Sequence, residues 1–185
     1  SQVMGLLESY QRDYLVWLEF GLQSAQDTTL RRINRGHDVA SFGSAVRLAH
    51  EYGINVCAHV ILGLPGEDRD HMNRTADYLA DLSVQGVKIH LLYVLQDTAL
   101  CALYHQGKFR CLQREEYAER VADFLERLPA HMVIQRLTGD PGKGHLVAPL
   151  WALEKGKNLQ CIQETLAGRG TWQGRLRAEK GKGGP

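Results

Sequence analysis

Long apolar runs, closely spaced cysteines and an excess of one charge are all missing from this 185-residue sequence. No apolar run approaches the roughly 20 residues needed to span a bilayer, so we expect no membrane partner. The net charge of +1 gives no overall electrostatic case for binding nucleic acid. No two cysteines are closely spaced, so no zinc or iron–sulfur motif is visible. The cysteines are Cys57, Cys101, Cys111 and Cys161.

The composition otherwise fits an ordinary folded chain. Apolar residues make up 44% of the sequence, which suffices for a core, and the 23% of charged residues excludes a broadly disordered chain. Ser1 to Met4 contain no basic stretch, so we expect no signal peptide. With no disulfide framework in view, we expect a reduced, cytoplasmic setting.

Apolar runs and helical periodicities alternate through the first half of the chain. The runs at 14–20, 54–62 and 87–94 predict strands, and Gly21 is expected to break the first of them. Helices are predicted to start at Asp27, Asp38 and Asp68 and to cross between strands, which implies parallel pairing. The first ten residues have helical spacing but begin abruptly, which favours a fragment of a larger chain.

After Thr98 the pattern changes to that of an appended α+β segment. We divide the chain into residues 1–98, an extension at 99–167 and a basic, glycine-rich tail at 168–185. The tail is predicted to be disordered, with weak RNA contact as a possible role. Within the extension, the predicted elements are a short helix ending near Gly107, a helix over 115–128, a strand over 131–137 and a helix over 147–166.

Polar residues near the strand ends are the candidates for chemistry. Glu19 and Gln23 flank the end of the first strand. A charge in an apolar strand must be paired or solvated. Glu19 therefore either pairs with a neighbouring arginine at the strand end or, together with Gln23, faces a ligand cleft. Arg35 lies in a turn in which Gly36 can adopt a positive φ. The Arg35 side chain is either solvated or binds a carboxylate through its planar guanidinium.

His59 and His90 hold comparable positions on successive strands. Each could be a satisfied core residue, but two on adjacent strands favour a functional lining. A two-histidine metal site has no evident third ligand. The bend at Gly63 and Leu64 leaves backbone groups open to a flat heterocycle. The segment 139–144 lacks the spacing of a phosphate loop and is expected to be a surface loop.

Three segments in a fixed order resemble the second half of a radical S-adenosylmethionine (SAM) enzyme. They are Leu18-Glu19-Phe20-Gly21-Leu22-Gln23-Ser24, Asn34-Arg35-Gly36-His37 and Ile61-Leu62-Gly63-Leu64-Pro65-Gly66-Glu67. The resemblance is greatest to the YhcC-type group, whose relatives include the elongator catalytic subunit and oxygen-independent coproporphyrinogen oxidase. It extends to about residue 166 through Lys88-Ile89-His90-Leu91-Leu92 and Ile134-Gln135-Arg136-Leu137-Thr138-Gly139-Asp140.

The resemblance implies an α/β fold, the second half of a partial (β/α)₆ barrel with strands four to six, plus a C-terminal α+β extension. It implies SAM contacts at Gln23, Arg35 and His59, a ribose-facing Glu19 and a nearby His90. Gly63 and Leu64 match the segment that lies against adenine. The intact enzyme would generate a 5′-deoxyadenosyl radical that acts on an unknown substrate.

The family's Cys-x-x-x-Cys-x-x-Cys motif has no counterpart among these residues. The [4Fe–4S] cluster would therefore be held by the missing N-terminal half of the barrel, which the chain would need as a partner. Alone, the chain is expected to be inactive. The alternatives are a non-catalytic nucleotide- or RNA-binding module and an inactive truncated product.

Overall fold

A computed structural model describes residues 2–142 and 144–180 of the chain. Among them, no helix has the length and apolar character needed to cross a membrane. The elements in chain order are α1 (Gln2–Tyr10), β1 (Trp17–Gln23), α2 (Asp27–Arg32), α3 (Val39–Glu51), β2 (Asn55–Leu62), α4 (Arg69–Asp81), β3 (Gly86–Leu91), β4 (Val94–Leu95), α5 (Ala99–His105), α6 (Arg114–Arg127), β5 (Val133–Arg136), β6 (Leu146–Ala148), a 3₁₀ turn (Leu150–Leu153), α7 (Lys155–Arg169) and α8 (Arg175–Lys180).

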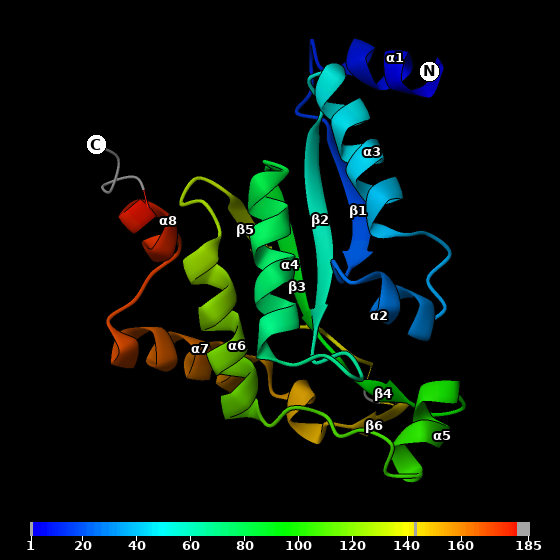
Figure 1. The fold of residues 1–185 in the computed structure, drawn as a ribbon, viewed down its shortest axis with the longest axis vertical. Helices are drawn as coiled ribbons and strands as arrows, with labels where there is room; N and C mark the ends of the chain where they lie inside the picture. The colour runs from blue at the N-terminus through cyan, green and yellow to red at the C-terminus, as the bar shows by residue number, and fades with distance from the viewer. Residues whose placement is uncertain (1, 143, 181–185) are drawn as a thin grey trace.

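Four parallel strands in the order β1-β2-β3-β5 form the main sheet. Figure 1 shows α4 and α6 in front of this sheet, and the arrowheads of β1 and β2 point to the end where α2, α5 and β4 lie. The prediction of parallel strands joined by helical crossovers is confirmed. β5 comes from the predicted extension, so the extension continues the sheet.

Alternation along the strands gives the sheet two different faces. On β2, residues Val56, Ala58, Val60 and Leu62 are buried against the helices, with buried apolar residues of β3 beside them. The intervening residues of β2 and β3 face the other way and include His59 and the polar residues Lys88 and His90. We call the side that they occupy the polar face of the sheet.

Helix boundaries follow local capping chemistry. Asp38 accepts a hydrogen bond from the backbone N–H of Ser41, and Asp68 forms a capping box with His71, as the predicted helix starts require. The predicted cap at Asp27 is wrong. Its carboxylate accepts from the N–H of Val39 and so supports α3 rather than its own helix.

The first strand differs from its prediction because Gly21 does not interrupt it. β1 continues to Gln23, where φ is 68° and the register with β2 shifts. A Cβ at residue 21 would lie 2.5 Å from Gln23 Nε2 and 2.6 Å from Arg35 Nη2. Gly21 therefore makes room for two side chains that cross the strand, which is a packing role rather than a strand break.

Two other predicted elements divide into smaller ones. The predicted strand over 87–94 separates into β3 and the short β4, because the ladder with β2 ends where β2 itself ends, at Leu62. The predicted helix over 147–166 begins instead with β6, which pairs antiparallel with β4. Pro149 then precedes the 3₁₀ turn, and α7 starts only at Lys155.

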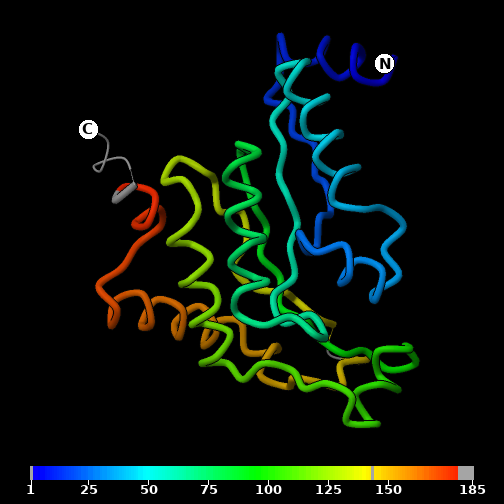
Figure 2. Tube along the Cα trace, viewed as in Figure 1, coloured from blue at the N-terminus to red at the C-terminus, as the bar shows by residue number. Residues whose placement is uncertain are grey.

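The prediction of a disordered tail is wrong for residues 168–180; residues 181–185, with Lys182, lie outside the described part. α7 runs to Arg169, Gly170 takes the left-handed conformation that ends it, and α8 follows. Figure 2 shows the trace of this segment folding back beside α6. Arg177 pairs with Asp77 and Asp81 at the end of α4.

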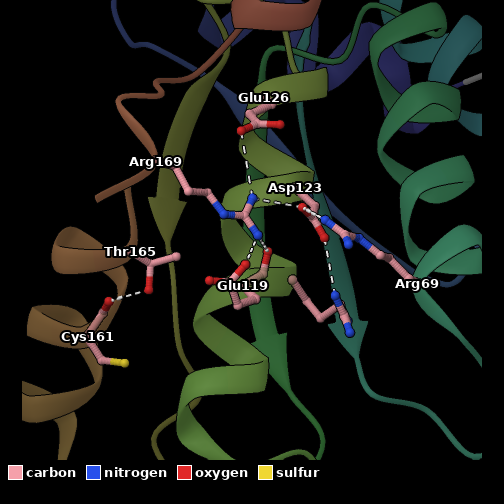
Figure 3. Close-up of polar contacts among 8 residues, drawn as sticks. Arg69, Glu119, Asp123, Glu126, Cys161, Thr165 and Arg169 are labelled. Carbon is pink, nitrogen blue, oxygen red and sulfur yellow. Dashed lines mark hydrogen bonds and ion pairs between the residues drawn. The ribbon is translucent and has the colours of Figure 1, made fainter. Parts of the chain in front are cut away.

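A charged cluster joins α7 to the helices that cover the sheet (Figure 3). Asp123 of α6, whose side chain is only 6% exposed, accepts from Arg69 of α4 at 2.5 Å and from Arg169 of α7 at 2.8 Å. Arg169 also pairs with Glu119 and lies 3.7 Å from Glu126. Asp123 thus holds three helices through one buried carboxylate.

We predict that Asp123→Ala lowers the free energy of unfolding by about 1–2 kcal/mol, because it removes the buried carboxylate that Arg69 and Arg169 share while Arg169 keeps Glu119 and Glu126. Urea denaturation followed by circular dichroism measures this change. Glu164→Ala on the exposed side of α7 is the matched control and should change stability by less than about 0.5 kcal/mol. Equal stability of both variants would contradict a central role for Asp123.

Candidate functional site

An open cavity of about 330 Å³ lies on the polar face where β1, β2 and β3 end. We call it the strand-end cavity. Its lining combines two imidazoles, one amide and a phenol ring with aliphatic side chains. The lining residues are Gln23, His59, Ile61, His90, Leu91, Leu92 and Tyr93. The carboxyl ends of parallel strands are the usual place for ligands in α/β sheets.

Glu19 joins the three neighbouring strands β1, β2 and β3 across the polar face. Its carboxylate accepts from Lys88 Nζ at 2.5 Å and from His59 Nε2 at 2.7 Å, so it links β1 to β3 and to β2. These two hydrogen bonds, first that of Lys88 and then that of His59, lower the pKa of Glu19 below its ordinary value. The charged partner of Glu19 is a lysine rather than the expected arginine. Both hydrogen-bond partners of the carboxylate, Lys88 and His59, belong to this chain.

His59 and His90 stack on each other with ring centroids 5.4 Å apart. Burial lowers the pKa of His90 to about 4, and the positive charges of Arg136 and Lys88 and the neighbouring His59 act in the same direction. His90 is therefore neutral at pH 7. Its Nε2 atom is buried and has no hydrogen-bond partner among the described residues. The two histidines therefore lie together and line one cavity, and the functional role expected for this lining stays a prediction.

The side chains of Gln23 and Arg35 both end close to Gly21. Gln23 lines the strand-end cavity. Arg35 is exposed, donates to the Gly21 carbonyl at 3.2 Å and lines a neighbouring cavity of about 390 Å³ that also includes Glu19 and His37. The positive φ in its turn belongs to Asn34 rather than to Gly36, which corrects the prediction for that turn.

Gly63 and Leu64 are not among the residues that line the strand-end cavity. Gly63 has φ of 86°, and a Cβ there would lie 3.1 Å from Leu112. Leu64 is buried and lines a third, apolar cavity of about 350 Å³. Ile61 and Leu92 line both this apolar cavity and the strand-end cavity, so the two are neighbours.

A hydrogen bond between Ser24 and Glu67 connects the loops that follow β1 and β2. Burial raises the pKa of Glu67, and the bonds from Ser24 and Thr29 offset part of that rise. Arg32 adds a second link by donating to the Pro65 carbonyl at 2.7 Å. These contacts fix the two loops that flank the polar strand ends.

The structure thus gathers Gln23, His59 and His90 around one cavity, with Glu19 attached through His59. It places Arg35 beside this group and Leu64 in the adjoining apolar cavity. The sequence interpretation did not include Lys88 or Tyr93 in the site. Strand alternation was the available signal for Lys88, because it precedes His90 by two residues and so shares its face.

Two sequence profiles match the chain in succession. The profile described as the Radical SAM superfamily matches residues 4–79, and that of the Radical SAM C-terminal domain matches residues 84–167. The chain belongs to the radical SAM superfamily. It corresponds to the C-terminal part of that family, as the sequence resemblance predicted.

Three relatives illustrate the match. The chain is 42% identical over 171 residues to the uncharacterized protein YtqA of Bacillus subtilis, covering 92% of this chain and 53% of YtqA. It is 35% identical over 150 residues to the protein YhcC of Escherichia coli K12, covering 80% of this chain and 48% of YhcC. Human Elongator complex protein 3 is 28% identical over 127 residues, covering 66% of this chain and 23% of the human protein. The chain therefore spans about half the length of the first two relatives.

A solved structure of the archaeal Methanocaldococcus infernus Elp3, with an N-terminal deletion, matches with a TM-score of 0.76. The match has 20% sequence identity and covers 90% of this chain and 39% of the archaeal chain. It shows a shared fold and confirms the predicted α/β class, a partial barrel with an extension.

The family implies SAM and a [4Fe–4S] cluster, and the described residues fit the two groups differently. The strand-end cavity offers amide and imidazole groups that suit the polar parts of SAM. For the cluster, no group of three or more candidate metal ligands gathers among residues 2–142 and 144–180. Cys57 and Cys111 are buried, with burial raising the pKa of each thiol to about 11. These cysteines do not fit a cluster.

Glu67→Gln tests the buried carboxyl that joins the two loops. The pKa of Glu67 is higher in the folded chain than its ordinary value of 4.5, so the folded state binds the proton more tightly than the unfolded state does. The stability that this difference confers is fully present below pH 4.5. It is lost as the pH rises through the raised pKa. Glutamine cannot ionise, so the variant should gain stability relative to the unmodified chain between pH 4.5 and pH 7.

Urea denaturation at several pH values measures this difference, with Glu164→Gln on the exposed surface of α7 as the control. The control should follow the unmodified chain at every pH. A constant stability difference between Glu67→Gln and the unmodified chain across this range would show that Glu67 does not titrate as its burial implies.

Proposed function

We propose that this chain forms one side of the SAM-binding cleft of a radical SAM enzyme. The observation that carries the proposal is the meeting of Gln23, His59 and His90 around one cavity at the carboxyl ends of three parallel strands. Family membership supports it, because SAM is the substrate and cofactor that defines the superfamily.

Each polar group of the cavity has a chemical use toward SAM. The Gln23 amide can both donate and accept a hydrogen bond. The Nε2 atom of His59 is already held by Glu19, so this ring is fixed in orientation. His90 supplies a neutral ring at pH 7. Arg35 is the nearby cation, and its planar guanidinium suits the carboxylate of the methionine part.

When bound, SAM and a reduced [4Fe–4S] cluster supply hydrogen abstraction through a 5′-deoxyadenosyl radical. The residues described here bind and orient SAM and keep water from it. The aliphatic residues Ile61 and Leu92, which separate the strand-end cavity from the apolar cavity, serve the last role. The cluster ligands would come from residues outside this chain.

RNA binding through the tail stays a prediction. Arg169 and Arg177 are engaged in ion pairs with acidic residues of α4 and α6. Arg175 lies over the ring of Trp172. These contacts assign the described arginines of the tail to folding, which favours the SAM proposal over an RNA-binding module.

We predict that Gln23→Ala and Arg35→Ala each weaken SAM binding about 10-fold, because each removes a hydrogen-bonding group worth about 1.4 kcal/mol. Isothermal titration of SAM into the natural protein that contains these residues measures the change. Arg74→Ala on the exposed surface of α4 is the matched control and should bind as the unmodified protein does. Unchanged affinity in both test variants would refute the assignment of this cavity to SAM.

A further inference from the structure

Two cations occupy paired positions of β3 and β5, just after an irregularity in the register of these strands. Lys88 and Arg136 are register partners in the parallel ladder. His90 follows Lys88 by two residues and therefore shares its face. Lys88 is 18% exposed, whereas Arg136 is exposed to solvent. The arrangement brings two positive charges and one imidazole to neighbouring positions.

The negative charge available at this position does not balance the two cations. Glu19 lies on the far side of Lys88 and is shared between Lys88 and His59. No described residue forms a hydrogen bond or an ion pair with the guanidinium of Arg136. Like charges at paired positions of neighbouring strands are unfavourable. The Lys88–Arg136 pair therefore carries a net positive charge.

His90 is the third group at this position. Its Nε2 is buried without a hydrogen-bond partner among the described residues, which is costly for a polar atom. The charges of Arg136 and Lys88 both reach His90, because both contribute to lowering its pKa. His90 also lines the strand-end cavity, so it connects the cationic pair to that cavity.

We propose that Lys88, Arg136 and His90 bind an anionic group of the substrate, a carboxylate or a phosphate. This inference rests on the proposed function, because it places the substrate beside the cavity assigned to SAM. An anion here would balance both cations and could accept hydrogen bonds from the ammonium and the guanidinium. Glu19 would hold Lys88 in position while leaving the other donors of its ammonium free.

The test is a titration of the full chain with inorganic phosphate and, separately, with succinate, at constant ionic strength set with sodium chloride. Nuclear magnetic resonance of the histidine Cε1–H groups reports binding at His90. A bound anion should shift the His90 signal saturably and raise its pKa. Saturation by phosphate assigns a phosphate group to the substrate, and saturation by succinate assigns a carboxylate.

Arg136→Gln should weaken this binding at least 10-fold, and Lys88→Gln should have a similar effect. Arg136 is exposed, so its replacement leaves the fold intact even if Lys88→Gln does not. Arg74→Gln, on the opposite side of the sheet, is the matched control and should not change binding. Equal binding by Arg136→Gln and the unmodified chain would overturn the proposal.

A parallel titration of the natural protein that contains these residues, with SAM and with each anion, separates this inference from the proposed function. If SAM binds and neither anion saturates, the anion site is refuted and the SAM proposal stands. If an anion saturates and SAM does not bind, the SAM proposal fails alone. Displacement of the anion by SAM would assign Lys88 and Arg136 to SAM's own carboxylate and overturn the substrate site, whereas simultaneous binding supports it.

Discussion

The pairing of β2 with β1 on one side and β3 on the other is the constraint on which the rest of the structure depends. The two registers place His59 opposite Gly21 and Lys88. Only in these registers can the carboxylate of Glu19 contact both His59 and Lys88. A shift of one residue would turn His59 into the helix-covered core and Val60 toward the cavity.

This constraint separates two environments within one thin sheet. On the helix side, fully buried apolar residues of β2 and β3 belong to the same hydrophobic core as residues of α4 and α6. On the polar face, charges are tolerated because they are partly solvated and joined to one another. The helices therefore stabilise the fold from one side of the sheet and leave the polar face outside the apolar core.

The sequence predicted the elements well where one residue's local chemistry decides the structure. Asp38 and Asp68 cap helices as predicted, because each acts within a single turn. The failures involve partners distant in sequence. Asp27 supports the N-terminus of another helix, and Gly21 is needed for side chains that cross it. For the candidate site, strand order placed His59 and His90 together, but nothing local indicated that Lys88 would be the partner of Glu19.

The segment predicted to be a disordered tail shows most clearly that partners distant in sequence are hard to predict. Its contacts also reach the helix that follows one of the loops at the strand ends. The sequence suggested a solvated basic segment at Arg169 and Arg177 because their acidic partners lie 43 or more residues earlier in the chain. Arg169 shares Asp123 with Arg69, the first residue of α4, which directly follows the loop containing Glu67. The extension therefore supports the start of the helix whose preceding loop borders the strand ends.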